Sequence, residues 1–221
     1  EIELWADRLS RFRRDSLVAH LQRHAVERPV QVEPEVFALF ETSEAIRERS
    51  GGAFDLAWYT GGRLRLDPAR QTVELSSPDL RLDLGAIGKG FAIDRAVELL
   101  RAHQIERALL HGGTSTVFAL GAPPGCDGWR VAFAGVEGLE GVELCDAACS
   151  VSAQHGRTLE DGHGHVRDPR SGAAPERRLP AVVRAPNATL ADAWSTALLV
   201  DPSRADAAAA QGVALLTPAR A

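Results

Sequence analysis

Five short strand-like segments follow one another between residues 108 and 152, and they favour a fold built around an antiparallel sheet. Glycine and proline lie between them, as is typical of strands joined by turns. The segments are residues 108–110, 116–120, 129–133, 142–144 and 150–152. Further strands are predicted at residues 30–32, 181–183 and 213–216.

Helical patterns lie on both sides of these strands. Apolar residues, Phe12 among them, recur at helical spacing over residues 2–21 and predict one or two amphipathic helices. Pro34 at the start and a glycine pair at the end bracket another helix, residues 35–50. Further helices are predicted at residues 91–100, 190–199 and 202–211, the last of them ending at Gly212.

The order of these elements determines the fold class. Because helices and strands do not alternate strictly, we predict an α+β fold rather than a doubly wound sheet. The chain has no internal repeat and no linker, so residues 1–221 are expected to form a single domain. Within it we expect a mixed or antiparallel sheet with flanking helices.

Composition excludes several classes of protein. The formal net charge is −5, so nucleic acid is not an expected partner, because binding to phosphates needs clustered cations. No apolar run approaches the roughly 18 residues of a transmembrane segment. The three cysteines lack a CxxC spacing and are interpreted as apolar filler rather than as disulfides or zinc ligands.

The start of the chain leaves the compartment open. The sequence has no methionine and begins inside a helical pattern, so we expect it to be trimmed at its N-terminus. A signal peptide, a lipid anchor or a first strand would then lie outside it.

The only lysine among 25 basic residues, Lys89, lies in a glycine-rich segment, residues 83–91. A lysine kept where arginine is otherwise used indicates a need for a compact ammonium group. Loop amides before a helix also suit phosphate oxygens. The segment matches neither a P-loop nor a dinucleotide-binding pattern. The alternative is a strand-to-helix turn that needs glycine only for its geometry.

A second constellation lies in the predicted helix 190–199. Asp192 and Thr196 are four residues apart and share a helix face, with Ser195 beside them. One carboxylate, hydroxyls and a borrowed carbonyl suit Mg²⁺, which needs few protein ligands. Alternatively, Thr189 and Asp192 form a capping box with Asp in the usual Glu position.

Two further segments carry candidate chemistry. His165, which precedes an Asp-Pro-Arg-Ser-Gly turn, is a candidate acid or base, although it and His163 can also be solvated loop residues or a loose metal site. Phe54 can stack on a planar ring, and Asp55 can accept hydrogen bonds from ring or ribose donors.

Taken together and in this order, these segments resemble the ApbE family, the FAD:protein FMN transferases. The resemblance covers nearly the whole chain. The matching segments are residues 10–12 with Ser16, 50–55, 83–94, 112–113, 165–172 and 191–196.

The resemblance implies a Mg²⁺-dependent transferase that splits the pyrophosphate of FAD, moves FMN onto a Thr or Ser hydroxyl of a target flavoprotein and releases AMP. It implies a metal held by the backbone oxygen of Ala86 and the side chains of Asp192, Ser195 and Thr196. It implies FAD contacts at Phe12, Ala53, Phe54, Asp55, Asp83 and Lys89. His165 matches the histidine that activates the acceptor hydroxyl, and Asp192 is expected to be catalytic through the metal.

The chain also departs from the family pattern. The segment 56–82 is shorter than in the family, the usual first strand is missing, and Val151-Ser152-Ala153-Gln154-His155 replaces a Thr-Ser-Gly-Asp/Asn-Tyr pattern. These departures leave two alternatives open, a flavin-binding protein without catalysis and an FAD pyrophosphatase that yields FMN and AMP. The resemblance implies a bacterial protein, exported if typical of the family or cytoplasmic as an alternative.

Overall fold

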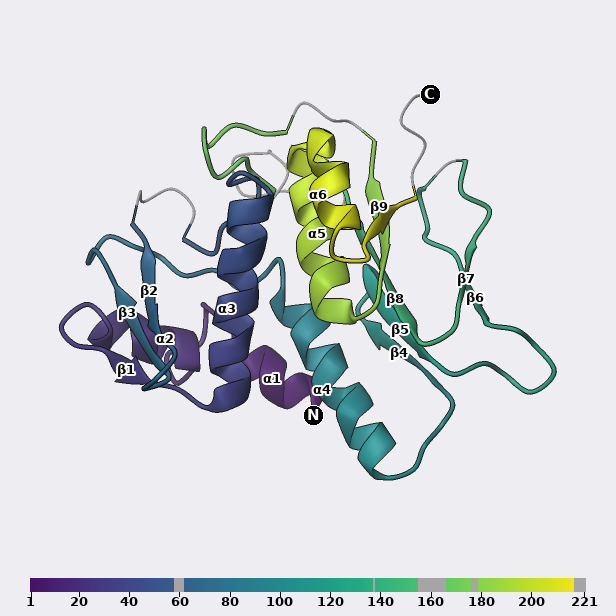
Figure 1. Cartoon of the computed structure of the whole chain (residues 1–221), viewed down its shortest axis with the longest axis horizontal. Coiled ribbons are helices and arrows are strands. Elements are labelled where there is room, and N and C mark those ends of the chain that lie inside the picture. The colour runs from purple at the N-terminus through teal and green to yellow at the C-terminus, as the bar shows by residue number, and fades with distance from the viewer. Residues whose placement is uncertain (58–61, 137, 155–165, 176–178, 217–221) are drawn as a thin grey trace.

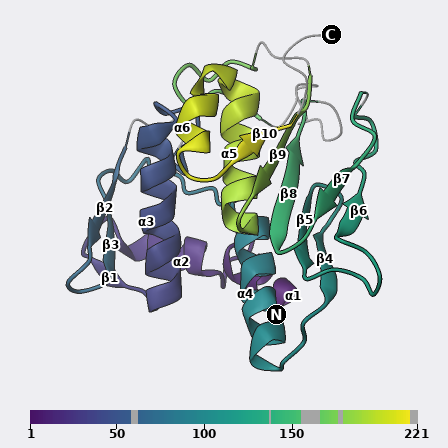
Figure 2. The ribbon, with the colours of Figure 1, turned by 45° about the vertical axis from the view of Figure 1, so that its right-hand side comes forward.

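In the computed structural model, a three-stranded and a five-stranded sheet lie on either side of a layer of helices, and a two-stranded hairpin forms a third sheet among the described residues (Figure 1). The structure describes residues 1–57, 62–136, 138–154, 166–175 and 179–216. Within these residues, helices α3, α4 and α5 lie between a small sheet near the N-terminus and a larger sheet formed by the later strands (Figures 1 and 2). Their bounds are Pro34–Arg49 for α3, Gly88–Ala102 for α4 and Ala188–Val200 for α5.

The larger sheet confirms the predicted antiparallel arrangement. Its strand order among the described residues is β10-β9-β8-β5-β4, and each neighbouring pair is antiparallel. The strands are β4 (Ala108–Gly112), β5 (Thr116–Leu120), β8 (Ala147–Ser152), β9 (Ala181–Ala185) and β10 (Ala214–Leu215).

Both faces of this sheet are covered. Strand β5 is buried at every position, because α4 and α5 pack on one face and the hairpin β6–β7 lies on the other. Phe118 therefore belongs to the main core, whereas the alternating Val117 belongs to a smaller core beneath the hairpin. The hairpin strands are β6 (Trp129–Val131) and β7 (Val142–Leu144).

The N-terminal half forms a smaller unit around the second sheet. Its order is β1-β3-β2, and its strands are β1 (Val30–Gln31), β2 (Leu64–Asp67) and β3 (Thr72–Leu75). Its helices are α1 (Ile2–Arg8), which packs against α4, and α2 (Leu17–His24), which contacts β3, while α3 contacts β2 and α5. The C-terminal end of the chain adds the 3₁₀ turn η1 (Pro202–Arg204) and α6 (Ala205–Ala209).

The helical prediction for residues 2–21 was wrong around Phe12. The Ser16 hydroxyl accepts from the Ala19 amide and starts a new helix at Leu17, so the chain between α1 and α2 forms a turn. Phe12 lies in that turn and is 81% exposed rather than on a buried face. Apolar residues happen to keep their helical spacing across this turn. The prediction was wrong there because periodicity alone does not detect the cap at Ser16.

The cysteine interpretation was partly wrong. Cys149 is buried in the smaller core, and burial raises the pKa of its thiol to about 12. Cys126 and Cys145 are exposed and fill no core. Among the described residues, the helices are all too short or too polar to cross a membrane.

The backbone of α5 packs closely against α4 at Gly90. A Cβ atom at this position would lie 2.1 Å from the carbonyl oxygen of Ala188, well inside van der Waals contact. The contact requires glycine for space, because the Gly90 φ angle is not in the left-handed region.

Replacing Gly90 by alanine should therefore destabilise the protein. We expect Gly90→Ala to lower the free energy of unfolding by about 1–3 kcal/mol, because the two helices must move apart. Gly88→Ala is the matched control in the same helix turn, since its Cβ would meet Leu9 and Leu84 at 3.6–3.8 Å, an ordinary contact. Urea unfolding followed by circular dichroism measures both variants, and equal stability of the two would contradict the close approach.

Candidate functional site

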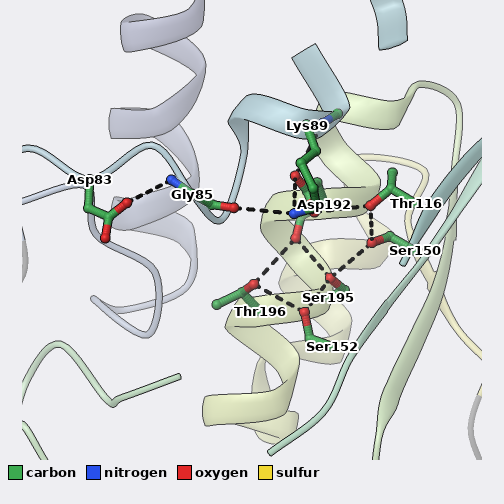
Figure 3. Close-up of polar contacts among 10 residues, drawn as sticks. Asp83, Gly85, Lys89, Thr116, Ser150, Ser152, Asp192, Ser195 and Thr196 are labelled. Carbon is green, nitrogen blue, oxygen red and sulfur yellow. Dashed lines mark hydrogen bonds and ion pairs between the residues drawn. The ribbon is translucent and has the colours of Figure 1, made fainter. Parts of the chain in front are cut away.

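The buried carboxylate of Asp192 is the centre of the candidate site (Figure 3). It lies in α5 and is only 3% exposed. Its Oδ1 accepts from Lys89 Nζ at 3.0 Å and from Thr116 Oγ1 at 3.1 Å. Its Oδ2 accepts from the Gly90 amide at 3.1 Å and lies 3.2 Å from Lys89 Nζ. Residues distant in sequence thus converge on one carboxylate, which can bind a cation.

Helices α4 and α5 hold each other in place through carboxylates. Asp192 of α5 accepts from the Gly90 amide in the first turn of α4. In return, Asp94 of α4 accepts from the amides of Ala188 and Thr189 in the first turn of α5, each at 2.8 Å. Burial raises the pKa of Asp94 even though these groups donate to it. The reciprocal contacts fix the position of Asp192 relative to the loop before α4.

The capping-box alternative for Asp192 was wrong. The N-cap of α5 is Asn187, whose side chain accepts from the Leu190 amide at 2.8 Å. The helix therefore begins at Ala188, two residues before its predicted start, and Asp192 does not cap α5. Its carboxylate faces α4 instead.

A chain of hydroxyl groups lies beside the carboxylate, between α5 and the large sheet. We call Thr116, Ser150, Ser195, Ser152 and Thr196 the hydroxyl chain. Successive oxygens along it are 3.0, 3.3, 2.8 and 3.2 Å apart, and Thr116 ends it with its bond to Asp192. Because each hydroxyl has one proton, Thr116 donates to the carboxylate and Ser150 can donate to Thr116, whereas Ser195 donates to the backbone carbonyl of Asp192 at 2.8 Å.

The two predicted hydroxyl ligands are not equivalent. Ser195 is fully buried and contacts Ser150, Ser152 and the Asp192 carbonyl, so its oxygen is already surrounded by protein. Thr196 is only partly buried and lies 3.5 Å from the same carbonyl. Thr196 is therefore the better placed of the two for a metal.

The glycine loop does not present a row of free amides. The amide of Gly85 donates to Asp83, those of Ile87 and Gly88 donate to Leu84, and that of Gly90 donates to Asp192. The phosphate-cradle hypothesis for this loop therefore lacks its donors in this structure. What the loop offers instead is the Lys89 ammonium and backbone carbonyls.

The predicted FAD-contacting residues fall into an exposed and a buried group. Asp83 pairs with Arg11 at 3.2 Å, and Arg11 in turn covers the ring of Phe12, with 4.4 Å from its Cζ to the ring centroid. This group lies at the surface. Phe54 is 2% exposed and belongs to the main core, so its ring has no open face for stacking.

Ala53 and Asp55 flank this buried ring. Ala53 is fully buried, and Asp55 accepts from the Ala57 amide at 2.8 Å and pairs with Arg63 at 3.7 Å. The Asp83 amide donates to the Leu56 carbonyl, which joins this segment to the glycine loop.

His165 lies outside the described residues, but the turn after it is well anchored. Arg170 pairs with Asp168 at 2.8 Å and with Asp201 after α5 at 2.9 Å. The hydrogen bond from Arg170 holds the pKa of Asp168 below its ordinary value. The stem of Arg170 also lies against Gly52, so the turn is tied to both α5 and the segment before Phe54.

The oxygen ligands predicted at the Asp192 site suit Mg²⁺ better than they suit a transition metal. No cluster of three His, Cys, Asp or Glu side chains occurs among the described residues. Asp192, Thr196 and the carbonyl of Ala86 offer hard oxygen ligands, and the Gly90 amide donates to Asp192 rather than back to that carbonyl. A cation that needs few protein ligands matches this set.

Four contributors to the site had no prediction: Thr116, Ser150, Ser152 and Asp94. The strand segments 116–120 and 150–152 were visible in the sequence, and polar residues in buried strands are an available signal. The pairing of Thr116 with Ser150 depends on strand register, which no local pattern specified.

Comparison with known proteins gives a consistent result. Residues 1–64 and 59–216 match the ApbE family. The chain is 31% identical to the FAD:protein FMN transferase of Treponema pallidum over 87% of this chain and 67% of that protein, and 30% identical to one from Klebsiella pneumoniae over 89% and 72%. The crystal structure of an ApbE protein from Thermotoga maritima superposes with a TM-score of 0.78 at 23% identity, covering 89% of this chain and 75% of that one. Its similarity supports the α+β fold.

Asp94 should be needed to hold α5. We expect Asp94→Asn to lower the free energy of unfolding by about 1–3 kcal/mol, because an amide places a donor against the buried N–H groups of α5. Asp79→Asn is the control, since Asp79 is exposed. Thermal and urea unfolding of both variants provide the measurement, and an unchanged Asp94→Asn protein would contradict the capping role.

Proposed function

This chain belongs to the ApbE family, and on that basis we propose that it is a flavin transferase that moves FMN from FAD onto a Thr or Ser hydroxyl of an acceptor flavoprotein. Relatives that carry the name FAD:protein FMN transferase support the reaction class. The second product is AMP. The acceptor is a protein partner whose hydroxyl must reach the site.

The buried carboxylate of Asp192 gives this proposal its main structural support. A carboxylate only 3% exposed is costly to the fold unless it is compensated, and Lys89, which also contacts the Gly85 carbonyl, compensates it here. Its placement at the junction of α4 and α5, with Lys89 beside it, supports a site for a cation and a diphosphate.

The proposed reaction is a displacement at phosphorus. The acceptor oxygen attacks the phosphorus on the FMN side of the FAD pyrophosphate, and the bond to the AMP oxygen breaks. Mg²⁺ bound at Asp192, Thr196 and the Ala86 carbonyl would neutralise charge on the non-bridging oxygens. Lys89 is proposed to contact the FAD phosphates, and the surface group of Phe12 and Asp83 is proposed to contact FAD.

The acceptor hydroxyl needs a base, because it is a weak nucleophile at neutral pH. His165 is proposed to take its proton. The ion pairs of Arg170 with Asp168 and Asp201 anchor the turn that follows, which would restrict where this histidine can move.

Loss of the carboxylate should abolish the chemistry. With FAD, Mg²⁺ and an acceptor peptide, we expect Asp192→Ala to release AMP at least about a hundred-fold more slowly than the wild type, since its charge holds the cation. Asp79→Ala serves as the surface control. Chromatographic detection of AMP measures the rate, and near wild-type release by Asp192→Ala would refute the assignment.

The histidine should act on the acceptor alone. We expect His165→Ala to slow transfer of FMN to an acceptor peptide about 10²–10⁴-fold, while FAD binding stays close to wild type. His163→Ala, two positions earlier in the chain, is the matched control. Flavin fluorescence on the acceptor measures transfer, and fluorescence titration measures FAD binding. Free FMN and AMP formed in the presence of the acceptor would instead identify a pyrophosphatase, and FAD binding without AMP would identify a carrier.

A further inference from the structure

Lys89 makes three contacts that tie the glycine loop to α5. Its ammonium group lies 3.0 and 3.2 Å from the two carboxylate oxygens of Asp192, and it donates to the Gly85 carbonyl at 3.2 Å (Figure 3). An ammonium group has three protons, so these contacts use its whole donor capacity. Lys89 thus bridges the Asp192 carboxylate and the Gly85 carbonyl.

Lys89 also supplies the charge that Asp192 needs. The carboxylate's other partners, the Gly90 amide and the Thr116 hydroxyl, are neutral. Among the described residues, the ion pair of Asp192 is with Lys89. Without it, a carboxylate that is 3% exposed would lack a counter-charge inside the protein.

The same ammonium stands where a cation would bind. It contacts the Asp192 carboxylate and the Gly85 carbonyl, which are oxygens of the kind that Mg²⁺ uses. Two cations cannot share these oxygens without strong repulsion. The Lys89 side chain is 42% exposed and flexible, so it can turn away, whereas Asp192 is fixed by α5.

We propose that Lys89 is the counter-ion of Asp192 in the metal-free protein, and that a divalent cation binds by displacing it. The inference rests on the proposed function, in which Asp192 holds the metal. The displaced ammonium, carried by the second residue of α4, is then available to phosphate oxygens of the substrate. The affinity for the metal therefore depends on how strongly the Lys89 ammonium competes with the metal ion for the Asp192 carboxylate.

The residue type agrees with this exchange. Lys89 is the lone lysine in a chain that otherwise uses arginine as its basic residue. A compact ammonium can stand in for a small spherical cation, whereas a planar guanidinium directs its donors in a fixed fork. A residue that only needed positive charge here could have been arginine.

A metal titration tests the exchange directly. Metal-free protein, prepared with EDTA and desalted, is titrated with Mn²⁺ while free Mn²⁺ is followed by electron paramagnetic resonance, and Mg²⁺ is then added as a competitor. We expect Lys89→Met and Lys89→Gln to bind Mn²⁺ about three- to ten-fold more tightly than the wild type, because the competing cation is gone. Thr116→Val is the control, since it removes a neutral donor to the same carboxylate and should not tighten binding.

Thermal unfolding provides a second readout that does not depend on activity. Without metal, both Lys89 variants should melt at a lower temperature than the wild type, because Asp192 is left without its counter-charge. Saturating Mn²⁺ should raise their melting temperatures more than it raises that of the wild type.

The outcomes separate the two proposals. Equal or weaker Mn²⁺ binding in both Lys89 variants, with clear binding by the wild type, would overturn the exchange and leave the proposed transferase intact. Absence of Mn²⁺ binding by the wild type, with and without FAD, would overturn the metal site itself and the exchange with it.

Discussion

The burial of one negative charge organises this structure. Asp192 is almost fully shielded from water, so each of its oxygens must find donors within the protein. The Gly90 amide and the Lys89 ammonium supply them from the first turn of α4, and the Thr116 hydroxyl supplies another from β5. These contacts are possible only while α4, α5 and β5 keep their relative positions, so the fold and the site depend on the same interactions.

The antiparallel register of the larger sheet places hydroxyl side chains beside the Asp192 carboxylate. Thr116 of β5 pairs with Ser150 of β8, and the pairing places their hydroxyls 3.0 Å apart on the face toward α5. Ser152, two residues further along β8, points the same way and reaches Ser195 and Thr196. The opposite face carries Val117 and Cys149 into the smaller core. One set of strands therefore separates a polar lining from an apolar core by alternation alone.

The sequence predicted the α+β class, the antiparallel strands and most helices, because these follow from local periodicity and from glycine and proline at the boundaries. It also placed Asp192 and Thr196 on one helix face. It failed at Phe12, where Ser16 ends the apparent helical pattern, and at the start of α5, where Asn187 rather than Thr189 forms the cap. Contacts such as Asp94 with α5 join residues 94 positions apart, and no local pattern carries that information.

The pairing of Lys89 with Asp192 suggests how a metal-dependent site can fold before it holds a metal. A buried carboxylate without a partner would oppose folding by several kcal/mol. An ammonium on a flexible side chain removes that cost in the metal-free protein. A divalent cation can displace this ammonium more readily than it could displace a rigidly held group. The same side chain then remains tethered beside the carbonyls of the loop. A single lysine can therefore stabilise the buried carboxylate in the metal-free protein and contact the substrate phosphates in the metal-bound protein. Arginine would be a poor substitute at this position, because its planar guanidinium is less compact.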